Sequence, residues 1–176
     1  MNSILRFGCL YGLALVFSFY LSHLLLGTDP DNFTKGEIVG YSVMIISSLA
    51  VVMGIKEFKQ KRAPAPLGFM NGLGVGLGIS FIAASIFALY NWFYLAFINP
   101  EFTATYIQYS EQQIRSSGLD PVIIEQQLAE LAHYAELMSS NFNQSVVMFA
   151  TVFIIGLLFS VVTAIALRTS QIQPKI

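Results

Sequence analysis

Charged residues are scarce in this chain of 176 residues, of which only 11% are Asp, Glu, Lys or Arg. Ordinary soluble domains carry roughly 25%. So few charges cannot coat a water-soluble globule when 55% of the residues are hydrophobic. The net charge of −1 also excludes an overall electrostatic attraction to nucleic acid. The composition therefore predicts a membrane protein without a nucleic-acid partner.

Cysteine and histidine are nearly lacking as well. The single Cys9 excludes an intrachain disulfide. Glu130 and His133 have the Glu-x-x-His spacing of di-metal carboxylate bundles, but such sites need a second copy of the motif, and the other histidine, His23, lies elsewhere. We expect an exposed helix face there, no metal and no cofactor. Since no set of Ser, His and Asp indicates a hydrolase either, we expect no enzyme.

Four stretches without charge are long enough to cross a bilayer as helices, which takes about 20 residues. We expect the fold class to be all-α, with four transmembrane helices at about residues 5–27, 37–55, 68–97 and 144–167. The first stretch is too long for a secretory signal and lacks a small-x-small cleavage pattern, so we expect a retained anchor. The whole chain, 1–176, is then one membrane domain.

The basic residues are unevenly divided between the two sides of these spans. Lys35 and Arg115 fall on one side, and the other seven of the nine fall on the opposite side. Those seven are Arg6, Lys56, Lys59, Lys61, Arg62, Arg168 and Lys175. Lys and Arg are retained on the cytoplasmic side of membrane proteins. We therefore expect both termini to be cytoplasmic.

Four of these residues form a cytoplasmic basic cluster after the second span: Lys56, Lys59, Lys61 and Arg62. Membrane lipid with anionic headgroups is one partner for it, at roughly 1 kcal/mol per basic residue near the surface. A stop-transfer signal that sets topology accounts for the same cluster, and we favour that interpretation. The prolines that follow at 64 and 66 indicate a short extended connector between the second and third spans.

Residues 99–143 are expected to form an extracytoplasmic helical hairpin between the third and fourth spans. Asn99-Pro100 and Asp120-Pro121 each have an N-cap residue followed by proline at the first helical position. Gly118 supplies the stop between the two helices. The second helix is amphipathic, with Ile124, Leu128, Leu131, Ala135 and Met138 at spacings of three and four. We expect this hairpin to cap the outer ends of the spans.

Small residues recur four apart in three of the predicted spans, which lets neighbouring helices approach closely. A phosphate-binding loop is excluded for the glycine-rich third span, because no strand precedes it and no Gly-Lys-Ser/Thr follows. Helix movement permitted by glycine is an alternative, but we favour close packing. The helix-packing residues predicted in this way are Gly8, Gly12, Gly68, Gly72, Gly76, Gly156 and Ser160.

The order of these features resembles that of the DUF4199 domain family, a group of bacterial membrane proteins. The resemblance covers essentially the whole chain, and its most specific element is the end of the second span, Gly54-Ile55-Lys56-Glu57-Phe58-Lys59. It implies a four-helix protein of the bacterial inner membrane. The family has no established activity, so it implies no catalytic or binding residues.

No acid or fixed base lies within the four charge-free stretches that form the cores of the predicted spans, whereas proton- and ion-coupled transporters retain such groups despite their cost. We therefore expect a non-enzymatic scaffold or accessory subunit, which meets a membrane-protein partner or a second copy of itself. The alternative is a homo-oligomeric channel or small-solute transport component lined by Ser, Thr and Asn. A lipid-modifying enzyme is a weaker third interpretation.

Overall fold

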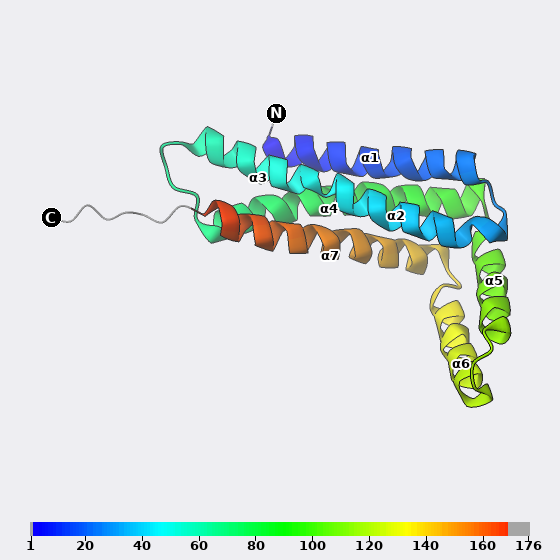
Figure 1. Ribbon diagram of the computed structural model, residues 1–176. Helices are drawn as coiled ribbons and strands as arrows, with labels where there is room; N and C mark the ends of the chain where they lie inside the picture. Colours follow the sequence, from blue (N-terminus) through cyan, green and yellow to red (C-terminus); the bar gives the residue numbers. More distant parts are fainter. Residues whose placement is uncertain (1, 169–176) are drawn as a thin grey trace.

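The computed structural model describes residues 2–168, and every element in this part of the chain is a helix (Figure 1). Within it, four helical segments are long and apolar enough to cross a membrane. The predicted all-helical class and the predicted number of spans are thereby confirmed, and the chain is a multi-pass membrane protein. Lys175, which we predicted to be cytoplasmic, lies outside the described residues.

The spans are continuous helices because a bilayer core offers no water, so each backbone N–H and C=O must be paired within its own segment. At 1.5 Å per residue, the 24 residues of the first helix reach about 36 Å. In chain order the elements are α1 (Ser3–Leu26), η1 (Pro30–Asn32), α2 (Phe33–Ser47), α3 (Leu49–Arg62), α4 (Phe69–Phe93), η2 (Tyr94–Ile98), α5 (Phe102–Ser116), α6 (Pro121–Leu137) and α7 (Asn141–Leu167).

The second span is longer than its charge-free stretch and is made of two helices. It runs over Pro30–Arg62 and is interrupted at Ser48, between α2 and α3. The Ser48 hydroxyl donates to the Ile45 carbonyl at 2.6 Å, which competes with the regular backbone pattern. Paired serines are a known cause of helix kinks, and Ser47 precedes Ser48 here. The basic residues at the end of α3 continue the second span beyond its charge-free stretch.

Helix α4 is the central element of the bundle, with α1 packed on one side and α7 on another (Figure 1). Helices α1 and α4 run parallel, since Gly8 lies against Ile82 and Gly12 lies against Ile86. Helix α3 contacts α1, α4 and α7 and closes the core. The largest apolar side chains with almost no exposure there are Tyr11, Phe87, Leu15, Ile55, Leu67, Ile79, Val51 and Val152.

Helices α5 and α6 form a hairpin that projects to one side of the bundle, across the direction of the spans (Figure 1). This position differs from the predicted one over the outer ends of the spans (Figure 1). We call the end of the bundle next to the hairpin the hairpin end, and the opposite end the basic end. The predicted start and stop signals at Asp120 and Gly118 are confirmed: Asp120 accepts from the Val122 amide, and Gly118 has a φ of 70°.

The predicted helix start at Asn99 is wrong. The turn before it, η2, is a π-helix in which the Asn99 amide donates to the Tyr94 carbonyl at 2.8 Å. The Asn99 side chain donates to the Tyr94 hydroxyl at 3.3 Å and caps no helix. Helix α5 begins three residues later, at Phe102, with Glu101 as its N-cap. A wide helical turn thus changes the direction of the chain where α4 ends.

Candidate functional site

Helices α4 and α7 meet along a seam of small residues. An added Cβ atom on Gly72 would lie 3.2 Å from the Cβ of Ala164, and one on Gly76 would lie 2.6 Å from the Cβ of Ser160. One on Gly156 would lie 2.5 Å from the Cβ of Ser80. Four residues forward on α4 correspond to four residues back on α7, which is the register of antiparallel helices. We call these six residues the α4–α7 seam.

Two serines of the seam occupy equivalent positions on the two antiparallel helices. Ser80 lies against Gly156, while Ser160 lies against Gly76. Each hydroxyl donates to the glycine carbonyl four residues earlier on its own helix, Ser80 to Gly76 at 2.8 Å and Ser160 to Gly156 at 2.6 Å. Both side chains are fully buried, and these bonds satisfy the hydroxyl donors without water. The seam is therefore polar in composition yet internally paired.

The other predicted packing glycines divide into two groups. An added Cβ on Gly8 would lie 2.7 Å from the Ile82 Cβ, and one on Gly12 would lie 2.8 Å from the Ile86 Cβ, so both hold α1 against α4. Gly68 behaves differently, because its added Cβ would meet only the Asn71 side chain, at 3.7 Å. Gly68 is the N-cap of α4. The structure therefore places it outside the seam.

The basic cluster is split into paired and exposed members. Lys61 donates to Glu57 at 2.6 Å, and Arg6 of α1 also pairs with Glu57. Lys59 donates to the Leu167 carbonyl at 2.9 Å and so caps the end of α7. Lys56 and Arg62 are exposed. Half of the predicted cluster thus joins α1, α3 and α7 at the basic end, and the other half faces outward.

An aromatic and polar contact fastens the hairpin to the second span. The Phe33 ring contacts the rings of Phe102, Tyr106 and Tyr109 at centroid distances of 5.8, 5.6 and 5.3 Å. The Tyr106 hydroxyl donates to a carboxylate oxygen of Glu37 at 2.7 Å. Burial raises the pKa of the Tyr106 hydroxyl, and the hydrogen bond and charge of Glu37 raise it further. Tyr106 therefore remains a neutral donor at physiological pH.

A second set of polar contacts links the hairpin and α4 to the start of α7. Gln144 donates to the Thr103 hydroxyl at 2.7 Å and to the Met138 carbonyl at 2.8 Å. Nearby, Asn91 of α4 donates to the Ser145 hydroxyl at 3.3 Å. These bonds connect the base of α5 and the end of α6 to the start of α7. They leave the far end of the hairpin without such ties.

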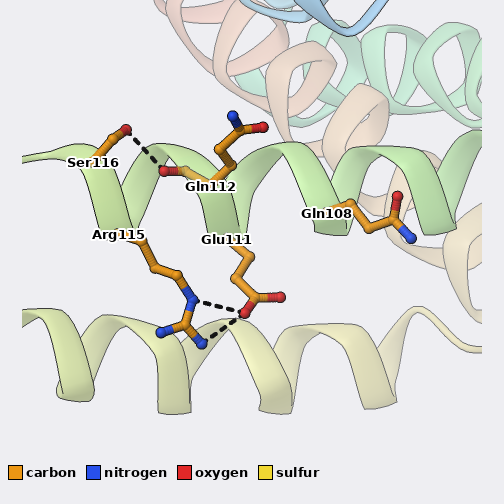
Figure 2. A pocket seen from close by; sticks show the side chains of 5 residues that line it. All are labelled: Gln108, Glu111, Gln112, Arg115 and Ser116. Carbon is orange, nitrogen blue, oxygen red and sulfur yellow. Dashed lines mark hydrogen bonds and ion pairs between the residues drawn. The ribbon is translucent and has the colours of Figure 1, made fainter.

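A shallow depression of about 380 Å³ lies on α5 (Figure 2). Its lining residues all belong to this one helix: Gln108, Glu111, Gln112, Arg115 and Ser116. Figure 2 shows Glu111 and Arg115 on one side of α5, joined by an ion pair of 2.7 Å, and Gln112 and Ser116 on the other. Small-molecule sites are concave and enclosed by several elements, so this depression supports no catalytic assignment.

The Glu-x-x-His pair lies on the exposed side of α6. Gln126 donates to the Glu130 carboxylate at 3.2 Å, and His133 is exposed. Within residues 2–168, no three His, Cys, Asp or Glu side chains are grouped so that they could hold a metal ion. Both residues thus lie on an exposed helix face, which the lack of a second Glu-x-x-His motif led us to expect.

Sequence reasoning missed three connections between elements. Gly54 lacks a side chain and so leaves room for the side chains of Phe7 and Ile79, at the place where α1, α3 and α4 meet. Glu57 is the acid that pairs Arg6 with Lys61, and its position among basic residues was a usable signal. The bond between Tyr106 and Glu37 spans 69 positions of sequence, and no local pattern contains such a pair.

Comparison with known proteins gives one match. Searches of curated proteins and of solved structures found none. A family model described as "Protein of unknown function (DUF4199)" matches residues 6–169, which include the hairpin and all of the spans except the first three residues of α1. The chain therefore belongs to the DUF4199 family, as its order of spans and hairpin led us to expect.

Proposed function

We propose that the protein is a non-enzymatic membrane scaffold or accessory subunit whose hairpin meets a partner with a basic surface. One observation carries the proposal: α5 and α6 contain 15 and 17 residues but no buried side chain. Helices that bury so little add little to the stability of the bundle, because burial is the main stabilising term. A surface held out in this way is suited to contact another molecule.

The charge of the hairpin defines the partner. Residues 99–143 carry six acidic residues and one basic residue, Arg115, which is already paired with Glu111. Glu125 and Glu136 are exposed on α6, about 20° apart around the helix at 100° per residue. Opposite charge steers association and selects partners. A basic segment of another membrane protein, or of a second copy, fits this face.

The orientation that we propose follows from the distribution of charge. The basic end is formed by the start of α1, the end of α3 and the end of α7, which carry Arg6, Lys56, Lys59, Lys61, Arg62 and, directly after α7, Arg168. We place that end in the cytoplasm of a bacterium, both termini included, and the hairpin outside the inner membrane. In a Cys9→Ala background, an impermeant maleimide should label Glu125→Cys but not Gln60→Cys in intact cells. The opposite labelling pattern would show the orientation to be inverted.

The interaction itself is tested by purification of the full chain in mild detergent, followed by mass identification of what accompanies it. Charge reversal at Glu125→Lys and Glu136→Lys should remove the accompanying protein. Glu101→Lys, which reverses one charge at the exposed base of the hairpin, is the control and should retain it. Equal recovery with all variants, or no protein above an untagged background, would contradict the proposal.

The alternative of a homo-oligomeric channel or small-solute transport component requires a pore between copies. Within residues 2–168, the interior of the bundle is occupied by side chains such as Tyr11, Phe87 and Ile79, each almost fully buried. Flux through vesicles that contain only the purified protein would favour this alternative. The scaffold proposal expects no flux above that of empty vesicles.

A further inference from the structure

One flank of α6 carries three apolar side chains that stay partly exposed within residues 2–168. Ile123 and Leu137 are 45% and 51% exposed, and Tyr134 lies with them. At 100° per residue these three fall within about 60° of one another around the helix. They lie next to the stripe that packs on α5, whereas Glu125 and Glu136 point to the opposite side. Glu130 falls among these three residues around the helix, between Leu137 and Ile123, and its carboxylate accepts from Gln126 at 3.2 Å.

The flank faces back toward the spans. In Figure 1, α6 lies on the side of α5 that is nearer the middle of the bundle. The Tyr106 bond to Glu37 fixes the base of the hairpin against α2. Tyr134 lies close to the same region, because Glu37 and Tyr41 of α2 add to the effect of burial in raising its pKa. The apolar flank of α6 is thus turned toward the level of the membrane.

The lateral surface of the spans is apolar too. On α2, Ile38 and Ile45 are exposed, and on α7, Phe142 and Val146 are exposed. These are lateral faces of membrane-spanning helices, where lipid is the solvent. The end of α4 carries the exposed Trp92, an aromatic residue favoured at the membrane–water interface. The flank of α6 therefore continues a lipid-facing surface at the height where that surface reaches the headgroups.

We propose that α6 lies in the plane of the membrane interface at the hairpin end and inserts Ile123, Tyr134 and Leu137 between phospholipid molecules. Amphipathic helices in this position bury their apolar side to the boundary between headgroups and acyl chains. The acidic composition of the hairpin selects the lipid. Its carboxylates repel anionic headgroups and attract the ammonium groups of zwitterionic ones such as phosphatidylethanolamine.

The two faces of α6 then have separate roles. The apolar flank holds the hairpin on the lipid, and Glu125 and Glu136 stay in water, where a protein partner can reach them. Lipid contact does not depend on that partner. It can be measured with purified protein in vesicles, so its failure and the failure of the scaffold proposal are distinguishable.

The test uses the full chain with Cys9→Ala, reconstituted in vesicles of phosphatidylethanolamine and phosphatidylcholine. Nitroxide labels are placed one at a time at Ile123→Cys and Leu137→Cys, with Glu125→Cys and Ala132→Cys as controls on the opposite face. Oxygen concentrates in lipid, while a nickel chelate stays in water. We expect the ratio of oxygen to nickel collisions to be several-fold higher at 123 and 137 than at 125 and 132.

Two further results decide the assignment. Replacing about a third of the zwitterionic lipid by phosphatidylglycerol should lower the ratio at 123 and 137, because like charges repel. Four labels equally open to the nickel chelate would show that the hairpin stands away from the membrane and would overturn the proposal. Labels at 123 and 137 that are shielded from both reagents would overturn it as well, since protein would then cover the flank.

Discussion

The α4–α7 seam and the α5–α6 hairpin are both pairs of antiparallel helices, yet they are built on opposite principles. In the seam, Gly76 and Gly156 bring backbones together, and the serines opposite them are fully buried. In the hairpin, larger side chains such as Leu128 and Leu131 meet, but none is fully buried. In lipid there is little hydrophobic drive between helices, so close packing must supply the attraction. In water, half-buried leucines are enough to hold two helices together.

The comparison predicts that added volume in the seam has the largest effect on stability. Gly76→Leu would force side-chain atoms into Ser160 and should lower the free energy of unfolding by about 3 kcal/mol. Gly74→Leu is the matched control, two residues away on the same helix, because nothing lies within 4 Å of its added Cβ. Steric trapping in bicelles measures both. Equal losses for the two variants would mean that Gly76 has no special packing role.

A change in the hairpin interface should be felt locally. Leu128→Ala removes part of the α6 stripe that lies against α5, at a cost of about 1–2 kcal/mol for a half-buried leucine. Amide exchange in α5 and α6 should then rise about tenfold, while exchange in α4 and α7 stays unchanged. Val122→Ala, at a position that is 73% exposed, is the control. Faster exchange in the seam would show that the two regions unfold together.

The contact between Tyr106 and Glu37 should make the docking of the hairpin on α2 depend on pH. Because the pKa of Tyr106 is raised above its ordinary value of 10.0, the folded state holds the proton more tightly than the unfolded state. The contribution to stability is therefore full below about pH 10 and is lost as pH rises through the raised pKa. A distance measured between labels on α2 and α5 should widen in that window.

Tyr106→Phe should abolish this alkaline change and weaken docking of the hairpin by about 1 kcal/mol at neutral pH. Thr34→Val serves as the control. It removes the neighbouring contact of 3.1 Å with Tyr109 and leaves the Glu37 bond in place. An alkaline widening that persists in Tyr106→Phe would assign the titration to another group.

The smallest effect is expected at the basic end. Lys59→Met removes the donor that caps α7 at the Leu167 carbonyl, which should cost about 0.5–1 kcal/mol. Faster amide exchange confined to the last turn of α7 is the expected signal. Lys56→Met removes the charge of an exposed lysine and should leave that turn as it is. A similar change in both variants would point to the overall charge of the cluster as the cause.

Much of the fold could be predicted because it depends on local patterns. The start of α6 at Asp120-Pro121 and the stop at Gly118 follow from residues that satisfy or end a helix on the spot. Asn99-Pro100 carries the same signal but does not start a helix, because the side-chain amide of Asn99 donates to the Tyr94 hydroxyl instead. The predicted stripe through Leu128 is half-buried against α5 as its spacing indicates. A local signal is reliable only where no other residue competes for the same groups.

The candidate site divides in the same way. The recurrence of small residues predicted Gly72, Gly76, Gly156 and Ser160 as packing positions, but it also included Gly68, which lies beyond the reach of α7. Spacing along one helix gives a face, and only the register between two helices decides which members of that face have a partner. The link from Glu57 to Arg6 was out of reach for the same reason, since it joins two helices.

By itself the sequence determined the medium, the helical class and the number of spans. These follow from sums over composition and length, since a bilayer core accepts long charge-free helices and little else. The tertiary structure decided the pairing of Gly76 with Ser160 and the contact of Tyr106 with Glu37 that fixes the hairpin against α2. Each of these depends on atoms from segments far apart in the chain, and hydrogen-bond geometry and steric fit act only once those segments meet.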